Sequence, residues 1–576
     1  MRVCCSVVVV VWLCGAYGRA QVEHVPVVHP VYELLLHAEA RGIMPNFSSV
    51  MLPIQRKEVV AALRAIRRAD SLLSYTECQT LRLFEREFGI TVAERAVVFA
   101  SISDSTQLLF SRVITNDEKF LLHSASSSAS VSIVPLMSLD MRWAQGGGAH
   151  GILGTIGGRV FGTVDSSLGF FLQGTSTAVL SSGAEFLRED PQLLKNPTFR
   201  LYNARFINWS EAHLRYDYRW LYASIGRETR LIGAGYGMRS IMSNNSIPVD
   251  AVMLGTRFPS VELLAPVGFE YRFMHCSLLA EPLDINGVIN SRSAGAGTFV
   301  PPKFMALHRA ALRGAWGELA LWEAVVYNNR GVELAYITPF TFLKGSSDNL
   351  RDRDNALLGL DMTLRPISGI QVRGNFTLDD IEFGKIGVDS AGRSWWQNKI
   401  AWNLGVMMSP HRMPFDVTLE YSMVTPYTYT HFDRQNAMTQ DGILFTGTLP
   451  PNSDEIMGQV RWFWGGRYPL SCTVAYRRHG RNLYNAQGDI VRNVGGDVLF
   501  SLRRDPQTFA YIDQQTVRFL EGDRVERLVI AVSAGIELVR NLNLQFIYRY
   551  TTARTDEAPI AWQPHVVGLV VRFEDF

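Results

Sequence analysis

The sequence predicts a transmembrane antiparallel β-barrel preceded by a small N-terminal α-helical region. Three observations predict this fold class. The chain opens with the pattern of an export signal, and most of the rest alternates apolar and polar residues with a period of two. No later segment approaches the run of about 20 apolar residues that a membrane-spanning helix needs, so any spanning segments must be strands.

The first residues of the chain have the features of a signal peptide. Arg2 supplies a positive charge, residues 7–14 are apolar, and a small-x-small cleavage motif (Gly-Arg-Ala) ends the segment 1–20. Processing as a lipoprotein through Cys14 is the weaker alternative, because Leu13 occupies a position where such sites have a small residue. We therefore expect the mature chain to be exported.

Charge and cysteine content argue against several classes of protein. The 576 residues include 56 basic and 54 acidic side chains, a formal net charge of +2, so the basic excess of a nucleic-acid-binding protein is missing. The mature chain has Cys78, Cys276 and Cys472, which are far apart and form neither a disulfide framework nor a zinc-ligand spacing. We expect no cofactor, no bound metal and no nucleic-acid partner.

Residues 21–95 are predicted to form a small helical bundle. Apolar residues recur at helical spacing over residues 31–41, 55–69 and 75–88. Proline or glycine delimits the first and third of these segments. The basic side chains of the second segment lie off its apolar face, and we expect them to be solvated.

Residues 96–576 are predicted to form the barrel, with clear two-residue alternation from about residue 130. The clearest strands are residues 214–222, 370–377, 470–477 and 542–550. Each has one apolar and one polar or charged face. In the first of them, the apolar face comprises Leu214, Tyr216, Tyr218, Trp220 and Tyr222.

A water-soluble β-sandwich would show the same alternation, but its apolar faces favour branched aliphatic residues. Here Tyr and Trp recur near strand ends, as in the aromatic girdles of membrane barrels. Near the C-terminus the apolar residues occupy alternate positions: Val567, Leu569, Val571 and Phe573. The chain ends in the aromatic Phe576, which does not fall on this alternation. The favoured interpretation is one large closed sheet in a bacterial outer membrane, with outer-membrane lipid around it.

Short segments spread over residues 200 to 455 occur together in an order that resembles a known family. They are Gly226-Arg227-Glu228, Gly233-Ala234-Gly235, Ser243-Asn244-Asn245, residues 304–309 (FMALHR), Glu323, Pro339, Asp354-Asn355, Asp379-Asp380, Glu420-Tyr421, residues 425–431 (TPYTYTH) and residues 449–454 (LPPNSD). The N-terminal pieces HPVYELL, ARG and RKEVVAAL add to this set. The whole set resembles the Wzi family of capsule-assembly outer-membrane proteins.

This resemblance implies an 18-stranded barrel with a small helical domain on its periplasmic side. It also implies a role in holding capsular or exopolysaccharide at the cell surface, with periplasmic export or assembly machinery as a further partner. The stretch from 100 to 200 matches less clearly.

Two motifs suggest other chemistry but lack its structural context. Residues 146–151 satisfy GxGxxG, but a strand pattern follows where a dinucleotide site needs a helix, so a flexible loop is favoured. Asp379 and Asp380 are adjacent on a predicted strand and point to opposite faces unless a turn intervenes, whereas the two carboxyls of a glycosidase must face each other across a sugar.

His308 and His431 are the best candidate bases for an outer-membrane lipase or protease. Neither lies beside a serine that the sequence marks as a nucleophile. We therefore predict that the protein is not an enzyme.

Polysaccharide binding is the hypothesis that uses the available side chains most simply. Glycans are held by aromatic faces and by hydrogen bonds from Arg, Asn and Asp. The candidate contact residues are Arg227, Arg309, Asn355, Asp379, Trp395, Trp396, Tyr427, Tyr429 and His431. Each could instead be a girdle aromatic or a member of a lumenal ion pair.

The leading hypothesis is a non-enzymatic outer-membrane protein that binds capsular or exopolysaccharide and helps its attachment or assembly. In this hypothesis the outer loops hold the glycan and a polar network plugs the barrel. A porin-like channel for small solutes is the alternative, and a lipase or protease is the third.

Overall fold

The computed structural model describes residues 21–89, 119–125, 129–144, 150–181, 190–202, 205–262, 266–284, 298–505, 507–555 and 565–574. The predicted signal peptide, the boundary expected at residues 95 and 96, most of the GxGxxG segment and Phe576 lie outside these residues. Within the described residues, no helix is long and apolar enough to cross a membrane.

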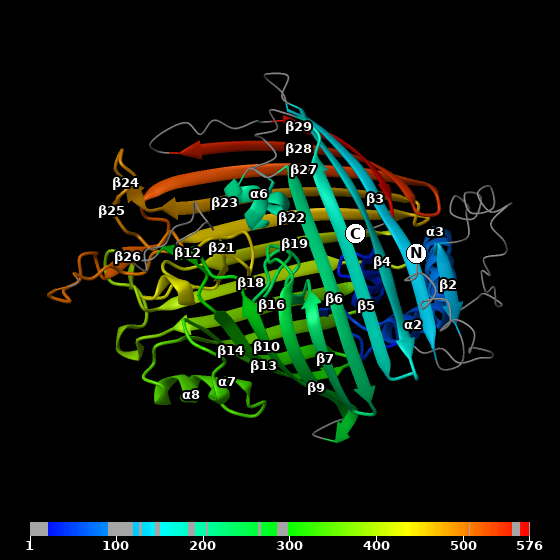
Figure 1. Cartoon of the computed structure of the whole chain (residues 1–576), viewed down its shortest axis with the longest axis horizontal. Coiled ribbons are helices and arrows are strands. Elements are labelled where there is room, and N and C mark those ends of the chain that lie inside the picture. Colours follow the sequence, from blue (N-terminus) through cyan, green and yellow to red (C-terminus); the bar gives the residue numbers. More distant parts are fainter. Residues whose placement is uncertain are drawn as a thin grey trace, which may run out of the picture.

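Eighteen long strands form a closed antiparallel barrel (Figure 1). They are β3 (Ser130–Ala144), β4 (His150–Val164), β5 (Leu168–Val179), β6 (Phe206–Tyr218), β7 (Leu221–Glu228), β9 (Val249–Glu262), β10 (Pro266–Leu278), β13 (Lys303–Gly314), β14 (Gly317–Asn328), β15 (Asn355–Ile367), β16 (Ile370–Asp380), β18 (Lys399–Met408), β19 (Phe415–Val424), β22 (Ser453–Trp464), β23 (Tyr468–Arg481), β27 (Asp523–Val539), β28 (Leu542–Thr555) and β29 (His565–Phe573). The last strand pairs with the first, from Val566 opposite Ala144 to Phe573 opposite Met137. Closure leaves no open edge, as a sheet in lipid requires. The predicted fold class is confirmed.

Shorter elements lie at the two ends of the barrel, inside it or against its outer face. The strands are β1 (Met51–Leu52), β2 (Leu122–Ala125), β8 (Leu231–Ile232), β11 (Leu283–Asp284), β12 (Thr298–Phe299), β17 (Arg393–Trp395), β20 (Thr439–Gln440), β21 (Ile443–Leu444), β24 (Leu483–Tyr484), β25 (Ile490–Arg492) and β26 (Thr516–Arg518). The helices are α1 (Val31–Ala40), α2 (Arg56–Arg68), α3 (Tyr75–Glu87), α5 (Pro191–Leu194), α6 (Pro197–Tyr202), α7 (Leu334–Ile337) and α8 (Leu343–Asn349), with 3-10 turns η2 (Asp70–Leu72), η4 (Phe383–Lys385) and η5 (Arg434–Asn436). β2 extends the sheet by pairing with the start of β3.

The two faces of each strand meet different surroundings. In β16, Gln371, Arg373 and Thr377 are buried in the lumen while Phe376 is exposed on the outside. One predicted assignment is wrong: Tyr222 does not share the outer face of Leu214 but is buried inside. The reason is the tight turn at Arg219 and Trp220, which ends β6 and restarts the alternation in β7.

The barrel has a short-turn end and a long-loop end. At one end the strands are joined by tight connections, for example residues 165–167, 315–316 and 540–541. At the other end the connections are long, for example residues 425–452 and 482–522. The barrel is therefore strongly asymmetric along its axis.

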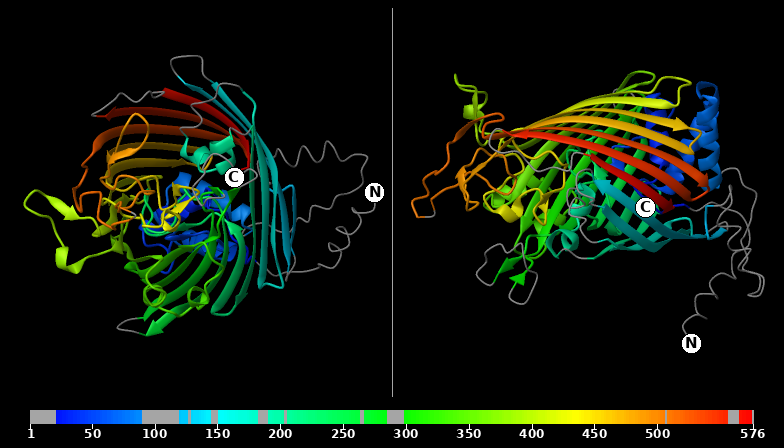
Figure 2. Two further views of the ribbon diagram at one scale, coloured as in Figure 1. Left: turned by 60° about the vertical axis from the view of Figure 1, so that its left-hand side comes forward. Right: turned by 90° about the horizontal axis from the view of Figure 1, so that it is seen from above.

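The three predicted N-terminal helices are present, and their observed bounds differ from the predicted ones by at most one residue. A capping box starts α3, in which Ser74 accepts from the backbone N–H of Glu77 and the Glu77 side chain accepts from that of Ser74. The helices share one apolar core that includes Val31, Leu63 and Leu81. Viewed near the barrel axis, they lie inside the ring of strands, at the short-turn end (Figure 2). We call residues 21–89 the plug.

Candidate functional site

The plug is bound to the inner wall around much of the barrel's circumference. Its polar contacts with the wall include Glu23 with Thr163, His24 with Glu228, Glu58 with Arg257, Pro45 with Arg365, Glu39 with Arg373, His37 with Asp416, and Glu87 with Arg540. These partners come from β4, β7, β9, β15, β16, β19 and the turn between β27 and β28. The plug therefore closes the short-turn end of the lumen instead of hanging below it as a separate body.

His37 is at the centre of one set of these contacts. Its Nδ1 lies 2.5 Å from Asp416 Oδ1 and its Nε2 lies 2.5 Å from Glu77 Oε1. Burial opposes protonation of this ring, but the carboxylates of Asp416 and Glu77 outweigh it and raise the pKa of His37. The imidazole of His37, between two carboxylates, joins α1 both to α3 and to the barrel wall.

His24, His213 and Glu228 form a second buried cluster, and their ligand atoms lie within 4.8 Å of one another. Hydrogen bonding accounts for this arrangement without a metal ion. His24 Nδ1 lies 2.8 Å from Glu228 Oε1, and His24 Nε2 lies 3.1 Å from an Arg215 nitrogen. His213 Nε2 accepts from the His24 backbone N–H at 3.3 Å. Because Arg215 and Arg230 also flank the cluster, a further cation is disfavoured.

Two long connections fold back into the lumen, and we call them the inner loops: residues 229–248 and residues 425–452. The Glu420 carboxylate accepts from the backbone N–H groups of Tyr236, Gly237 and Met238 at 2.7 to 3.1 Å. The Lys303 ammonium donates to the carbonyl oxygens of Ala437 and Thr439 at 2.9 and 2.7 Å. The inner loops pack with the lumenal side chains of β9 to β19 into one apolar core.

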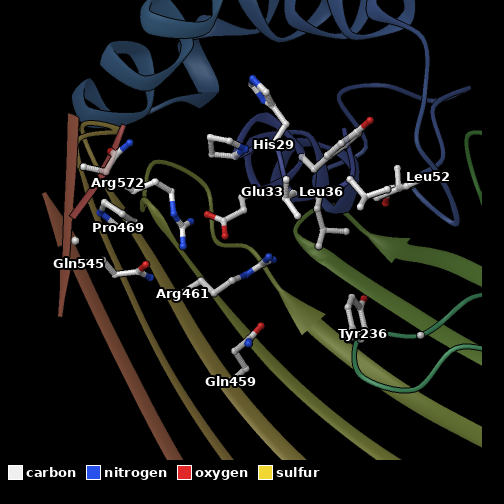
Figure 3. Close-up of a pocket in the computed structure, with 18 of the residues that line it drawn as sticks. His29, Glu33, Leu36, Leu52, Tyr236, Gln459, Arg461, Pro469, Gln545 and Arg572 are labelled. Atoms are coloured by element: carbon white, nitrogen blue, oxygen red, sulfur yellow. The ribbon is translucent and has the colours of Figure 1, made fainter. Parts of the chain in front are cut away.

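The lumen is not filled evenly. Along β13 to β19 the inward side chains are buried, whereas along β22, β23, β27 and β28 most of them are half-exposed. We call these the filled side and the open side. A cavity of about 420 Å³ lies where the open side meets the plug, lined by residues of both and of the first inner loop. Arg461, Gln459, Gln545 and Glu33 point into this space (Figure 3).

Most of the predicted glycan contacts are buried, either in the filled side or among the long loops. The Arg309 guanidinium lies 2.5 Å from Glu318 Oε1 and 3.1 Å from Asp361 Oδ2. Asn355 Nδ2 donates to the Asn436 carbonyl at 3.1 Å. Arg309 links neighbouring wall strands, and Asn355 links the wall to the second inner loop, so in this structure both side chains are closed to a ligand.

Four further predicted residues belong to the same second inner loop or to its support. The Tyr429 backbone N–H donates to Asp379 Oδ2 at 2.6 Å. Tyr427 and Tyr429 are fully buried, and Trp396 packs edge-on against Tyr427 with ring centroids 6.1 Å apart. Their aromatic faces are occupied by protein. The expectation that these rings stack on sugar does not fit their positions.

The remaining predicted residues lie at accessible positions. Trp395 is half-exposed in the long loops, with the Lys385 ammonium 3.2 Å from its ring centroid. His431 is partly exposed and lies against the exposed ring of Phe432. Arg227 is on the outer face of β7, where it pairs with Asp250 at 2.9 Å. The structure therefore does not bring all nine predicted residues into one site.

Sequence reasoning did not single out the residues of the cavity. Alternation alone could place Gln459, Arg461 and Gln545 on the lumenal face of their strands. It carries no signal for which part of the lumen is filled by loops, because that depends on contacts between distant segments.

No protein-family profile matches the chain, and no curated protein matches it. Among solved structures, Wzi of Escherichia coli, an outer-membrane protein involved in group 1 capsule assembly and a carbohydrate-binding β-barrel, aligns with a TM-score of 0.54. The alignment covers 97% of this chain and 100% of Wzi at 12% identity. OprD of Pseudomonas aeruginosa aligns with a TM-score of 0.38 and 12% identity over 77% of this chain and 93% of its own.

The chain is a closed antiparallel β-barrel with the fold of Wzi. The likeness confirms the predicted resemblance at the level of fold. The first inner loop and the segments around residues 425–454, which carried much of that resemblance in the sequence, are the parts that fill the lumen.

His308, the first candidate base for a lipase, is on the outer face of this barrel. Its Nδ1 lies 3.0 Å from Glu323 Oε1, and within the described part of the chain its Nε2 has no hydrogen-bond partner. Among the described residues, therefore, no serine hydroxyl forms a hydrogen bond with this imidazole. His431, the second candidate, interacts through Nδ1 with the backbone of Asp433.

Proposed function

We propose that this protein binds capsular or exopolysaccharide at the outer surface of the outer membrane and helps to attach or assemble it, without acting as an enzyme. The plugged lumen is the observation that carries this proposal. A porin needs a continuous aqueous path, whereas here the plug contacts the wall around the barrel and the inner loops fill one side. The likeness to Wzi, itself described as a carbohydrate-binding barrel, supports the same function.

The orientation follows from the general architecture of such barrels, in which short turns face the periplasm and long loops face outward. The plug then lies at the periplasmic mouth, where export or assembly machinery could reach α2 and α3. The long loops lie outside and present Trp395, His431 and the exposed ring of Phe432, with Arg227 at the rim. Of these residues, Trp395, His431 and Arg227 are the glycan contacts that we retain from the sequence.

The proposal is tested by deleting the gene and measuring cell-bound against released polysaccharide. We expect deletion to shift polysaccharide from the cell-bound to the released fraction and the wild-type gene to reverse that shift. A deletion strain with an unchanged cell-bound fraction would contradict the proposal.

The porin alternative is tested separately by solute uptake. If deletion slows uptake of small solutes while surface polysaccharide is unchanged, the channel function is favoured instead.

A further inference from the structure

The cavity on the open side has an excess of positive side chains. Four arginines line it, Arg239, Arg373, Arg461 and Arg572, against one carboxylate, Glu33. Arg373 is paired with Glu39 at 3.1 Å, and Arg461 lies 3.3 Å from Asp416. Arg572 and Glu33 both have interactions of their own within the protein.

Arg239 differs from these three arginines. Its Nη1 donates to the carbonyl oxygens of Gly233 and Val50 at 2.9 and 3.3 Å, and among the described residues no carboxylate lies within ion-pair distance of it. Burial, followed by repulsion from Arg373, lowers the pKa of Arg239 to about 10. Buried charges in proteins are normally paired, so a lone guanidinium beside a cavity indicates a place for an anion.

The same cavity offers acceptors for hydroxyl groups. Gln459 Nε2 donates to Thr473 at 3.0 Å and Gln545 Nε2 donates to Ser533 at 2.7 Å. Within the described residues, the amide oxygens of both side chains accept no hydrogen bond. A volume of about 420 Å³ is within the range of about 300 to 1,000 Å³ usual for small-ligand pockets.

From this geometry we propose that the lumenal cavity binds a carboxylate-bearing sugar unit, that is, a uronate. Arg239 and Arg461 hold the carboxylate, and Gln459 and Gln545 accept from the sugar hydroxyls. This inference rests on the proposed function and deepens it, because it makes the polysaccharide an acidic one and gives it a second binding place inside the barrel.

The test is calorimetry on the full mature chain in detergent, with tri-galacturonate as the probe. The matched neutral probe is its methyl ester, which has nearly the same size and hydroxyl pattern. We expect the ester to bind at least about ten-fold more weakly than the acid.

Arg239→Gln should weaken binding of the acid by a similar factor, while Arg239→Lys retains most of it. Arg68→Gln, an exposed arginine on α2, is the control and should leave binding unchanged.

Folding of each variant is checked by the heat-dependent shift in gel mobility typical of intact barrels. Equal binding of acid and ester, or full binding by a folded Arg239→Gln variant, would overturn the inference. Inorganic phosphate that binds as tightly as the acid, with the same dependence on Arg239, would reduce the site to a general anion site and also overturn it. If cells lose surface polysaccharide on gene deletion but the cavity binds no uronate, this inference alone fails and the proposed function stands.

A second inference concerns the outer surface of the barrel and rests on different residues. The connection between β14 and β15, residues 329–354, folds back over the outer face of the wall. The backbone N–H of Leu343 donates to Glu323 Oε2 at 3.0 Å, and Phe340 stacks on Tyr271 with ring centroids 5.8 Å apart. Glu323 lies midway along β14, so the connection reaches halfway down the strand.

This connection covers one polar pair and several apolar residues of the wall, and it exposes large apolar side chains of its own. It shields the pair His308 and Glu323, and it buries the outward residues Ala306, Val325 and Tyr327. Its own Phe340 is 82% exposed and its Leu334 is 72% exposed. Figure 1 shows α7 and α8 at the edge of the strands, outside the ring.

We infer that residues 332–342 lie in the outer leaflet at its interface and contact lipid acyl chains. The exposed apolar side chains are continuous with the lipid-facing wall, where Leu319 and Leu321 on β14 are also exposed. An apolar surface at that position is stable in lipid and costly in water.

Photo-crosslinking tests this placement in whole cells. We expect Phe340→p-benzoylphenylalanine to give lipid adducts detectable by mass spectrometry. The matched control is Phe432→p-benzoylphenylalanine, because Phe432 is 73% exposed but belongs to the inner-loop region at the long-loop end. Equal adduct yields at the two positions, or none at position 340, would overturn the inference.

Discussion

The filled and open sides of the lumen are built from strands of the same kind but differ in what covers their inner faces. On the filled side, Trp322, Arg309 and Asn403 are buried beneath the inner loops. On the open side, Gln459, Gln545 and Arg549 occupy equivalent inward positions and are half-exposed. The difference teaches that the two-residue alternation sets the direction of a side chain, whereas distant loops decide whether that side chain is structural or available to a ligand.

The largest expected effect is a contrast between the two sides. Trp322→Ala should destabilise the barrel by about 3 to 5 kcal/mol, because it leaves a cavity in the filled side. Gln545→Ala on the open side should change stability by less than about 0.5 kcal/mol, because its surroundings are already hydrated. Denaturant unfolding in detergent measures both. Similar losses for the two variants would break the comparison.

The next effect concerns the contact between plug and wall. Asp416→Ala leaves His37 and Arg461 without their shared carboxylate, and we expect a loss of about 3 kcal/mol, as for breaking a buried ion pair. Asp70→Ala, at an exposed position of η2, is the control and should have little effect. A plug that loosens in the first variant should also become sensitive to protease in folded barrels.

Acidification should weaken the contact between His24 of the plug and Glu228 of the wall, by less than the loss expected for Asp416→Ala. Burial lowers the pKa of His24 from 6.5 to about 4, so the folded state holds this ring neutral when the unfolded state has begun to protonate. The stability from His24 is present above pH 6.5 and is lost as pH falls towards about 4. The apparent Tm of the wild type should drop over this range, and that of His24→Asn should drop less. Parallel curves for the two proteins would contradict this assignment.

The smallest expected effect belongs to the outer surface. Trp395→Ala should lower glycan binding two- to five-fold without changing stability, because its ring is half-exposed and stacks on a lysine. Tyr427→Ala should instead destabilise the fold by several kcal/mol, because that ring is fully buried. Glycan binding and unfolding measured on both variants separate a surface contact from a packing residue. Loss of binding by a stable Tyr427→Ala variant would reverse the distinction.

Most of the fold could be predicted from the sequence because it depends on local patterns. Helical spacing located α1 to α3, and alternation located strands such as β16 and β23. The error at Tyr222 came from a two-residue turn, after which the alternation of inward and outward side chains starts again. Reading the alternation straight through this turn assigns Tyr222 to the wrong face.

The candidate site was much harder to predict. Residue type suggested Tyr427, Tyr429 and Arg309 as glycan contacts, but aromatic and arginine side chains serve equally well to pack loops and pair charges inside a barrel. Their burial depends on the inner loops, which return to the lumen from two distant parts of the chain. Arg239 was missed for the same reason. Its lack of a carboxylate partner becomes visible only in the structure, where the carboxylates of Glu39, Asp361 and Glu420 accept hydrogen bonds from other residues.

Conductance of the purified barrel in planar lipid bilayers tests the central claim most directly. Because the plug is held to the wall by His24, His37 and Glu87, the wild-type protein should insert without producing a steady current, and Asp416→Ala should produce intermittent openings. A large and steady wild-type current would contradict a plugged, glycan-binding barrel and would favour an open channel.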